Sequence, residues 1–194
     1  MRVSVGIIAE DKSDVDVIDV IISKSTNAAY TPKSFVGNGC GRIRNKCREW
    51  AENLRERGCA LLILVHDLDA GSLRELQRVL ANALGNSPLK PAVIVIPVRE
   101  IEAWLLADHN AIRTALNIHE TIKKIPNPEG LAKPKEYLRD LIYRASKKRT
   151  TYLNTVHNAK IARASQMSCF RRCESFRPLQ DFIVKYLPST KRRG

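Results

Sequence analysis

The chain has 194 residues, of which 44% are hydrophobic, and it carries a formal net charge of +13. This length suits one domain, or one domain with an extension, and allows a sizeable core. No apolar run approaches the roughly 18 to 20 residues that a membrane-spanning helix needs, so we expect no membrane partner. The amino-terminal segment MRVSVGIIAEDK is typical of a first strand and not of a signal peptide, which predicts a cytoplasmic protein.

The positive charge is concentrated in the carboxy-terminal part of the chain. Residues 139–194 contain fourteen Lys/Arg and three Asp/Glu, whereas residues 1–138 contain nineteen and seventeen. A cationic surface attracts polyanions through phosphate contacts and counterion release. We therefore expect a nucleic-acid partner, DNA more than RNA. The alternatives are a solubilising charge or an acidic protein partner.

Five cysteines occur in the chain, at positions 40, 47, 59, 169 and 173. Their spacings do not form the CxxC pairs that are typical of structural zinc sites. An odd number of cysteines without a secretion signal also argues against disulfides. We expect free, partly buried thiols, with structural zinc as the less favoured alternative.

Four apolar runs are predicted strands, and each is followed by a helical pattern. The strands are Val3–Ala9, Thr31–Val36, Ala60–Val65 and Ala92–Val98. The first predicted helix has Ser13 as its N-cap, and the other three cover Ile43–Arg57, Ser72–Leu84 and Arg99–Asp108. Alternating strands and helices predict an α/β fold, with a Rossmann-like, mostly parallel four-stranded central sheet flanked by helices. The Gly-rich segment Gly37–Gly41 is a predicted flexible loop and lacks both GxGxxG and the P-loop lysine.

Beyond Asp108 only helical patterns follow. They cover Ala111–Leu116, Pro134–Ser146, Asn158–Ala164 and Phe176–Tyr186. We therefore expect an α/β core over residues 1–108 and a basic helical extension over 109–188 that packs on the core. Residues 189–194 are a predicted disordered tail.

The stretch ALLILVHDLDAGS (Ala60–Ser72) places two carboxylates directly after a buried strand. Asp67 and Asp69 point the same way if the extended backbone continues, because side chains alternate with a period of two. Ligands bind at the carboxyl ends of the strands in open α/β sheets. Hard carboxylate oxygens without thiolates or imidazoles suit Mg²⁺ or Mn²⁺.

Further acidic residues follow the first and last predicted strands. Glu10 comes after the first, and Glu100 and Glu102 come after the last. In a helix, residues two apart face away from each other, so only one of the two glutamates is expected to reach the site. His66 is more readily interpreted as a packed core residue than as a base.

A Glu after the first strand (Glu10) and a DxD after a later strand (Asp67 and Asp69) resemble the acidic motifs of the Toprim domain. This domain occurs in topoisomerases, primases and the nuclease half of overcoming-lysogenization-defect proteins. The segments EIEAWLLAD (100–108), PKEYL (134–138) and CESFRPLQDFI (173–183) look like a group of small Toprim-like proteins, some associated with an AAA/ABC-type ATPase in mobile or phage-defence loci. The resemblance implies Mg²⁺ at the two aspartates and acid/base or metal chemistry at Glu10.

The resemblance also favours Glu102 over Glu100 and implies that Lys133 or Lys135 faces phosphate. One departure is the segment Glu10–Asp14, where many members have a Gly-rich or Thr-Glu turn. Either Asp14 replaces the second acid of that turn or the site is altered.

These observations predict a metal-dependent phosphodiester-cleaving enzyme, a DNA endonuclease or nickase, with Glu10, Asp67, Asp69 and Glu102 as catalytic and metal-binding residues. The expected nucleic-acid ligands are Lys133, Lys135, Lys147, Lys148, Arg149, Arg171 and Arg172. The alternative is a non-catalytic Toprim-like subunit that holds nucleic acid or docks an ATPase. A primase-like nucleotidyl transfer would use the same acids, but the short chain and the missing zinc-binding domain make it less favoured.

Overall fold

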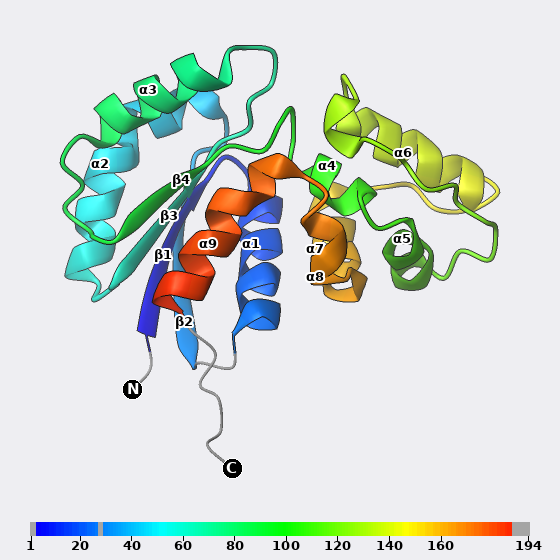
Figure 1. The fold of residues 1–194 in the computed structure, drawn as a ribbon, viewed down its shortest axis with the longest axis horizontal. Helices are drawn as coiled ribbons and strands as arrows, with labels where there is room; N and C mark the ends of the chain where they lie inside the picture. Colours follow the sequence, from blue (N-terminus) through cyan, green and yellow to red (C-terminus); the bar gives the residue numbers. More distant parts are fainter. Residues whose placement is uncertain (1–2, 27–28, 188–194) are drawn as a thin grey trace.

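A computed structural model describes residues 3–26 and 29–187, and these form one sheet of four parallel strands with helices on both faces (Figure 1). The strands are β1 (Val3–Ala9), β2 (Tyr30–Val36), β3 (Leu61–Val65) and β4 (Ala92–Val95), in the spatial order β2-β1-β3-β4. The predicted α/β fold with a parallel four-stranded sheet is thus confirmed. All strands run in the same direction, so their carboxyl ends lie at one edge.

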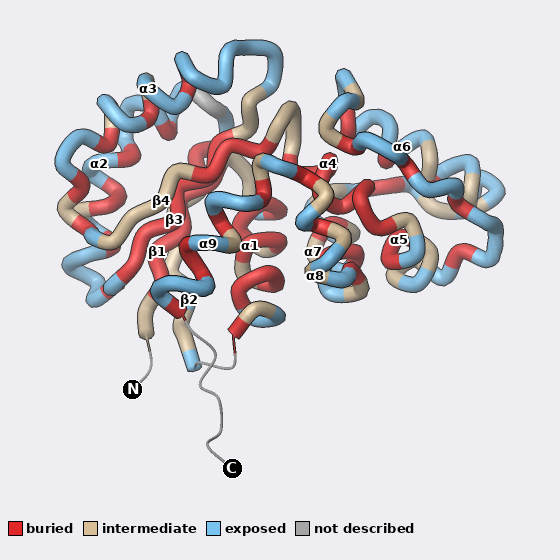
Figure 2. The backbone as a smooth tube through the Cα atoms, viewed as in Figure 1, coloured by how far each residue is buried: buried red, intermediate tan, exposed pale blue. Residues whose placement is uncertain are grey.

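The two faces of the sheet carry separate cores because strand side chains alternate. Helices α1 (Lys12–Ser25) and α9 (Arg177–Tyr186) cover the face that contains Ile7 and Ile63. Helices α2 (Cys40–Glu56) and α3 (Leu73–Leu84) cover the opposite face, which contains Ile8 and Leu64. Figure 2 shows β3 and most of β1 as buried, β2 and β4 as largely intermediate, and the outer sides of α2 and α3 as exposed.

Close packing between α2 and β1 depends on a glycine. A Cβ atom added to Gly6 would lie 2.9 Å from Leu54 Cδ1 and 3.3 Å from the Leu61 carbonyl oxygen. The absent side chain lets the helix approach the strand.

The shorter helices form a group beside the sheet that we call the helical lobe, residues 102–170 (Figure 1). It contains α4 (Glu102–Leu106), α5 (His109–Leu116), a 3₁₀ turn (Pro128–Gly130), α6 (Pro134–Ala145), α7 (Asn154–Ala164) and α8 (Met167–Phe170). Helix α7 packs against α1 and α5, and the Lys24 ammonium on α1 donates to the Arg163 carbonyl at 2.6 Å. After a second 3₁₀ turn (Glu174–Phe176), α9 returns to pack on β4. The predicted tail 189–194 lies outside the described residues.

Several predicted boundaries are wrong, for identifiable reasons. Helix α1 is capped by Asp11, which accepts from the Ser13 backbone N–H at 2.9 Å, so Ser13 is not its N-cap. Helix α2 begins at Cys40, inside the predicted Gly-rich loop. Strand β4 ends at Val95, shortly before Pro97, a residue that has no N–H for the ladder. In the part of the chain that the structure covers, no helix is both long and apolar enough to cross a bilayer.

Candidate functional site: an acidic pocket at the strand ends

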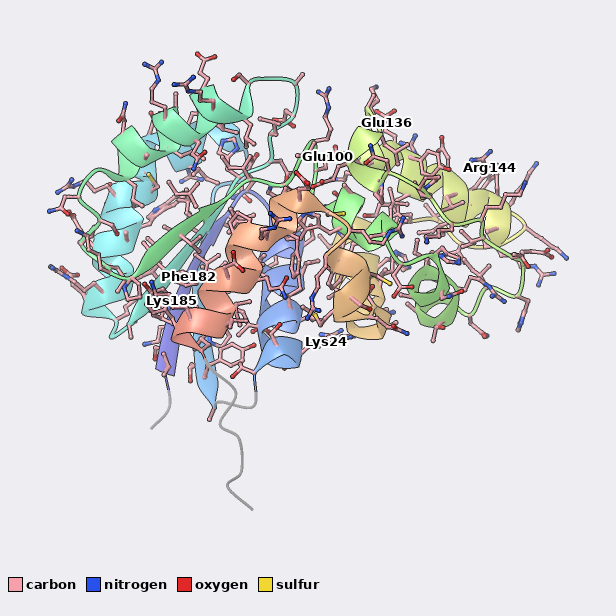
Figure 3. All side chains as sticks on the ribbon, viewed as in Figure 1. Lys24, Glu100, Glu136, Arg144, Phe182 and Lys185 are labelled. Carbon is pink, nitrogen blue, oxygen red and sulfur yellow. The ribbon has the colours of Figure 1, made fainter. Side chains whose placement is uncertain are left out.

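A pocket of about 260 Å³ opens where the strands end, and seven carboxylates line it. They are Glu10, Asp11, Asp14, Asp67, Asp69, Glu100 and Glu102; the other lining residues are Asn38, Gly39, Lys135 and Asn154. The structure therefore brings all four predicted site acids, Glu10, Asp67, Asp69 and Glu102, into one pocket. Figure 3 labels Glu100 at the junction between the sheet and α6.

Backbone hydrogen bonds beyond the strand ends hold the pocket together. The Asn38 N–H donates to the Glu10 carbonyl at 2.9 Å, which extends the pairing of β1 and β2. The Asp67 N–H donates to Glu10 Oε1 at 3.1 Å, which joins the ends of β1 and β3. The acids thus stand on short segments that the sheet itself positions.

The two aspartates of the DxD do not share an extended backbone. The Leu68 N–H still bonds to the Pro97 carbonyl at 3.0 Å, but Asp69 adopts a φ of 53°. We expected Asp67 and Asp69 to point the same way because the backbone would stay extended, and this reason is wrong at Asp69. Both side chains nevertheless line the pocket, because the chain turns there instead of leaving the edge of the sheet.

Burial and the surrounding negative charge raise the pKa of Asp67 well above its ordinary value. Burial is the largest cause, followed by the charges of Asp14, Glu102, Glu10 and Asp69. The Asp67 Oδ1 atom is buried and has no hydrogen-bond partner among the described residues. An unsatisfied buried acceptor surrounded by like charges is costly unless a proton or a cation compensates it.

Asp14 shows the same effect, although no motif singles it out beyond its place near Glu10. Burial, and then the charge of Glu102, raise its pKa from 3.8 to about 7. Its Oδ2 also accepts from the Asp11 N–H at 3.1 Å, which completes the capping box of α1. One carboxylate therefore both caps a helix and lines the pocket.

Glu10 is held by His66, which is 1% exposed. His66 Nδ1 lies 2.9 Å from Glu10 Oε1 and 2.8 Å from the Asp67 carbonyl oxygen. Burial alone lowers the pKa of His66, but the hydrogen bond and charge of Glu10 together with the hydrogen bond to the Asp67 carbonyl outweigh it, and the net shift is upward. His66 is thus buried, as predicted, and it also contacts the site residue Glu10 directly.

The other two glutamates are each held through one oxygen by the helical lobe. The Lys135 backbone N–H donates to Glu100 Oε2 at 2.7 Å. Glu102 Oε1 accepts from the Tyr152 hydroxyl at 3.0 Å and from Asn158 Nδ2 at 3.1 Å. Both glutamates line the pocket, so the expectation that only one reaches it is wrong: α4 begins at Glu102, and Glu100 precedes the helix.

The donors suit a hard divalent cation in kind, because all are carboxylate oxygens and Asp67 Oδ1 lacks a partner. Within the described ranges, however, no three His, Cys, Asp or Glu side chains already stand together as a group that could hold a metal ion. Side chains would have to rotate for an ion to be enclosed.

The predicted phosphate-binding residues differ in whether they line the acidic pocket, pair with an acid or are simply exposed. Lys135 lines the acidic pocket. Lys133 pairs with Glu136 at 3.0 Å and Lys147 with Glu120 at 2.8 Å, both at exposed positions. Lys148, Arg149 and Arg171 are exposed.

Arg172 is turned inward instead. Its guanidinium donates to the carbonyls of Ala107, Ile125 and Pro126. It links segments of the helical lobe through their carbonyls, so its guanidinium is not offered to a phosphate.

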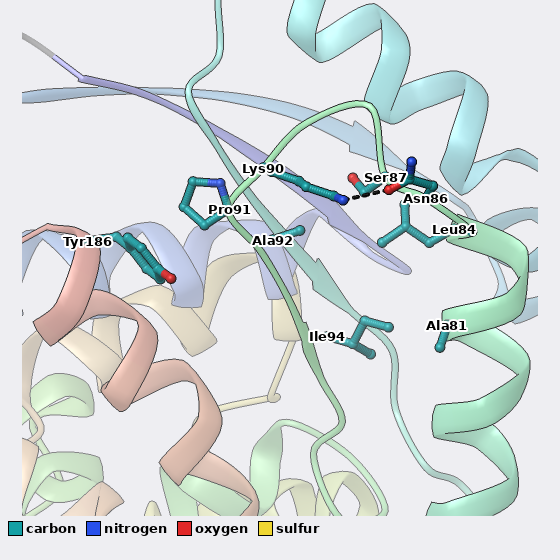
Figure 4. Close-up of a pocket in the computed structure, with 10 residues that line it drawn as sticks. Ala81, Leu84, Asn86, Ser87, Lys90, Pro91, Ala92, Ile94 and Tyr186 are labelled. Carbon is teal, nitrogen blue, oxygen red and sulfur yellow. Dashed lines mark hydrogen bonds between the residues drawn. The ribbon is translucent and has the colours of Figure 1, made fainter.

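A larger hollow, of about 690 Å³, lies along the outer side of β4 and has different chemistry (Figure 4). Pro91 lies on the side of Tyr186 of α9, whereas Ala92 and Ile94 point toward α3, and Lys90 Nζ donates to Asn86 Oδ1 at 2.5 Å. No carboxylate lines this hollow. The acidic pocket is therefore the candidate site.

Sequence reasoning missed four site residues: Asn38, Tyr152, Asn154 and Asn158. Asn154 Nδ2 donates to Asp11 Oδ2 at 3.3 Å across more than 140 residues of chain. Polar residues in loops and on helices are ordinarily solvated, and no local signal marks these as inward-facing.

Residues 9–183 match the family described as "Domain of unknown function (DUF4276)", and the chain belongs to this family. The match spans the whole acidic pocket and the whole helical lobe. No curated protein and no solved structure matches the chain significantly.

Proposed function

We propose that the protein is a metal-dependent phosphodiester-cleaving enzyme of the Toprim type that acts on DNA as an endonuclease or nickase. The observation that carries the proposal is Asp67: a buried oxygen without a hydrogen-bond partner, in a pocket where burial and four other carboxylates raise the pKa of its side chain. Such a group favours a bound divalent cation, which would satisfy the oxygen and offset the repulsion.

Asp67, Asp69 and Glu102 would hold the cation, and Glu10 and Glu100 line the same pocket. When bound, Mg²⁺ or Mn²⁺ increases the acidity of water and neutralises charge on the phosphate. Glu10 Oε1 is tied to His66 and Asp67, so Oε2 accepts the proton of the attacking water. The water oxygen bonds to phosphorus as the bond to the leaving sugar oxygen breaks, and that oxygen takes a proton from solvent.

Nucleic acid is the proposed substrate because the chain combines an acidic pocket with exposed cations, one of them at the pocket. Lys135 lies at the pocket, and the turn Lys147–Arg149 with Arg171 presents further positive charge on the helical lobe. Phosphate contacts by such residues position a backbone without reading its sequence.

Cleavage of supercoiled plasmid with Mn²⁺ or Mg²⁺ tests the proposal. We expect nicked or linear product from the wild type and a loss of at least about 100-fold in rate for Asp67→Asn. Asp181→Asn, an exposed acid on α9, is the matched control and should cleave normally. Equal rates for Asp67→Asn and wild type would overturn the assignment.

A second candidate is a non-catalytic subunit that holds nucleic acid or docks an ATPase. It is favoured by the lack, among the described residues, of a ready-made metal-binding group. In that case protonated carboxylates would stabilise the pocket in place of a cation. Calorimetric titration with Mn²⁺ separates the two, because only the enzyme binds the metal, whereas both bind DNA with a steep salt dependence.

A further inference from the structure

The helical lobe contributes a buried polar cluster directly behind the acidic pocket. Glu102, Tyr152 and Asn158 are 3%, 6% and 0% exposed. Tyr152 and Asn158 lie 50 and 56 residues beyond Glu102, near and on α7. No Lys or Arg side chain among the described residues forms an ion pair with Glu102.

The hydrogen bonds of this cluster are directional. Both donors reach Glu102 Oε1, and neither reaches Oε2. The Tyr152 hydroxyl also contacts Asn158 Oδ1 at 2.5 Å. A phenol carries one proton, so Tyr152 can serve only one of its two acceptors at a time, while the Asn158 amide orients the carboxylate continuously.

The result is a carboxylate with one oxygen anchored and the other presented to the pocket. Its charge acts on Asp14 and Asp67 strongly enough to raise both pKa values. A buried carboxylate that is held by neutral donors and not by a cation keeps its negative charge available for a ligand in the pocket.

We propose that Tyr152 and Asn158 are positioning residues that hold Glu102 as a metal ligand, so the helical lobe completes a site otherwise built on strand ends. This inference rests on the metal-dependent function proposed above. Hydrogen-bonding partners of this kind contribute about 10- to 100-fold to metal affinity in known sites. Removing either should weaken Mn²⁺ binding by a similar factor.

The test measures Mn²⁺ affinity by calorimetry, and the fold of the metal-free protein by circular dichroism. Tyr152→Phe removes only the hydroxyl and should lower affinity about 10-fold or more, and Asn158→Leu should do the same. Tyr143→Phe, at a 44% exposed position on α6, is the matched control. If Asn158→Leu does not fold, Tyr152→Phe alone decides.

A double-mutant cycle separates positioning from a merely structural role. In a Glu102→Gln background, Tyr152→Phe should cause no further loss of Mn²⁺ affinity, because the ligand it holds is already gone. Two results would overturn the inference and leave the proposed function standing. One is that the wild type binds Mn²⁺ and Tyr152→Phe binds it equally well; the other is that the losses of Mn²⁺ affinity in the cycle are additive. Absence of Mn²⁺ binding by the wild type would overturn both.

Discussion

The backbone N–H of Asp67 donates to Glu10 Oε1 at 3.1 Å, and His66 Nδ1 lies 2.9 Å from the same oxygen. Residues 57 positions apart in the sequence are thereby joined at the ends of β1 and β3. The contact gives Glu10 one fixed oxygen and one free oxygen, and it sets the protonation behaviour of His66.

Glu10→Gln should lower the pKa of His66. Burial lowers the pKa of His66, and the hydrogen bond and charge of Glu10 are the largest causes that raise it. Without them the imidazole pKa should fall below its wild-type value. Titration of the His66 ring protons by NMR in the presence of a chelator measures the change. Glu56→Gln, an exposed acid on α2, should leave the titration as in the wild type.

The same substitution predicts a pH-dependent loss of stability. A histidine whose folded pKa is raised contributes stability below its unfolded pKa of about 6.5, and this is lost as the pH rises through the folded pKa. Glu10→Gln should therefore cost more free energy of unfolding at pH 6 than at pH 9. A cost that is independent of pH would contradict the assigned interaction.

Asp14→Asn should stabilise the metal-free protein at alkaline pH. Raising a carboxyl pKa from 3.8 to about 7 favours the neutral form in the folded state, so stability falls as the pH rises between these values. Asparagine keeps the cap acceptor but carries no charge. We expect a gain of about 1–3 kcal/mol at pH 8 and a smaller one at pH 5, measured by urea unfolding with a chelator.

Asp181→Asn provides the control for this measurement, since its carboxylate is exposed and away from the pocket. It should change the free energy of unfolding by less than about 0.5 kcal/mol at either pH. Destabilisation of Asp14→Asn at pH 8 would show that its capping role exceeds the repulsion.

Mn²⁺ affinity should decrease as the pH falls through about 7. Asp14 has a pKa of about 7 and that of Asp67 is also raised, so a cation must displace protons from the pocket at lower pH. Calorimetry at pH 6 in buffers of different ionisation enthalpy should therefore give different apparent binding enthalpies. Buffer-independent enthalpies at pH 6 would mean that no proton is released.

Removing charge from the basic turn should weaken DNA binding and its salt dependence. Lys148→Ala and Arg149→Ala each remove an exposed cation, and each lost phosphate contact lowers the slope of log K against log salt by about 0.9. Lys147→Ala should have a smaller effect because Lys147 pairs with Glu120 at 2.8 Å. Fluorescence anisotropy with labelled DNA at salt concentrations from about 50 to 200 mM measures the slopes, because phosphate contacts change the affinity strongly over this range.

Lys46→Ala on α2 is the control for these variants, because Lys46 is exposed and paired with Glu49 at 2.6 Å. The affinity of this variant for DNA, and the slope of log K against log salt, should match those of the wild type. An equal decrease for Lys46→Ala would indicate a response to net charge and not to the basic turn.

Local patterns in the sequence were sufficient to predict the sheet and the meeting of four acids. The runs that became β1, β3 and β4 are apolar and β-branched, and parallel strands place their carboxyl ends at one edge. Glu10, Asp67, Asp69 and Glu102 follow these strands, so topology alone was enough to bring them into one pocket. Exact geometry was not needed for that prediction.

Tertiary structure decided what those acids experience. The turn at Asp69, the position of Glu100 ahead of α4 and the second role of Asp14 depend on where each segment ends, which local periodicity leaves open. Tyr152 and Asn158 reach Glu102 because α7 packs against α4, a contact between elements separated by about fifty residues of chain. Raised pKa values arise from distances between charges and from burial, and these are properties of the packed molecule that no spacing in the sequence determines.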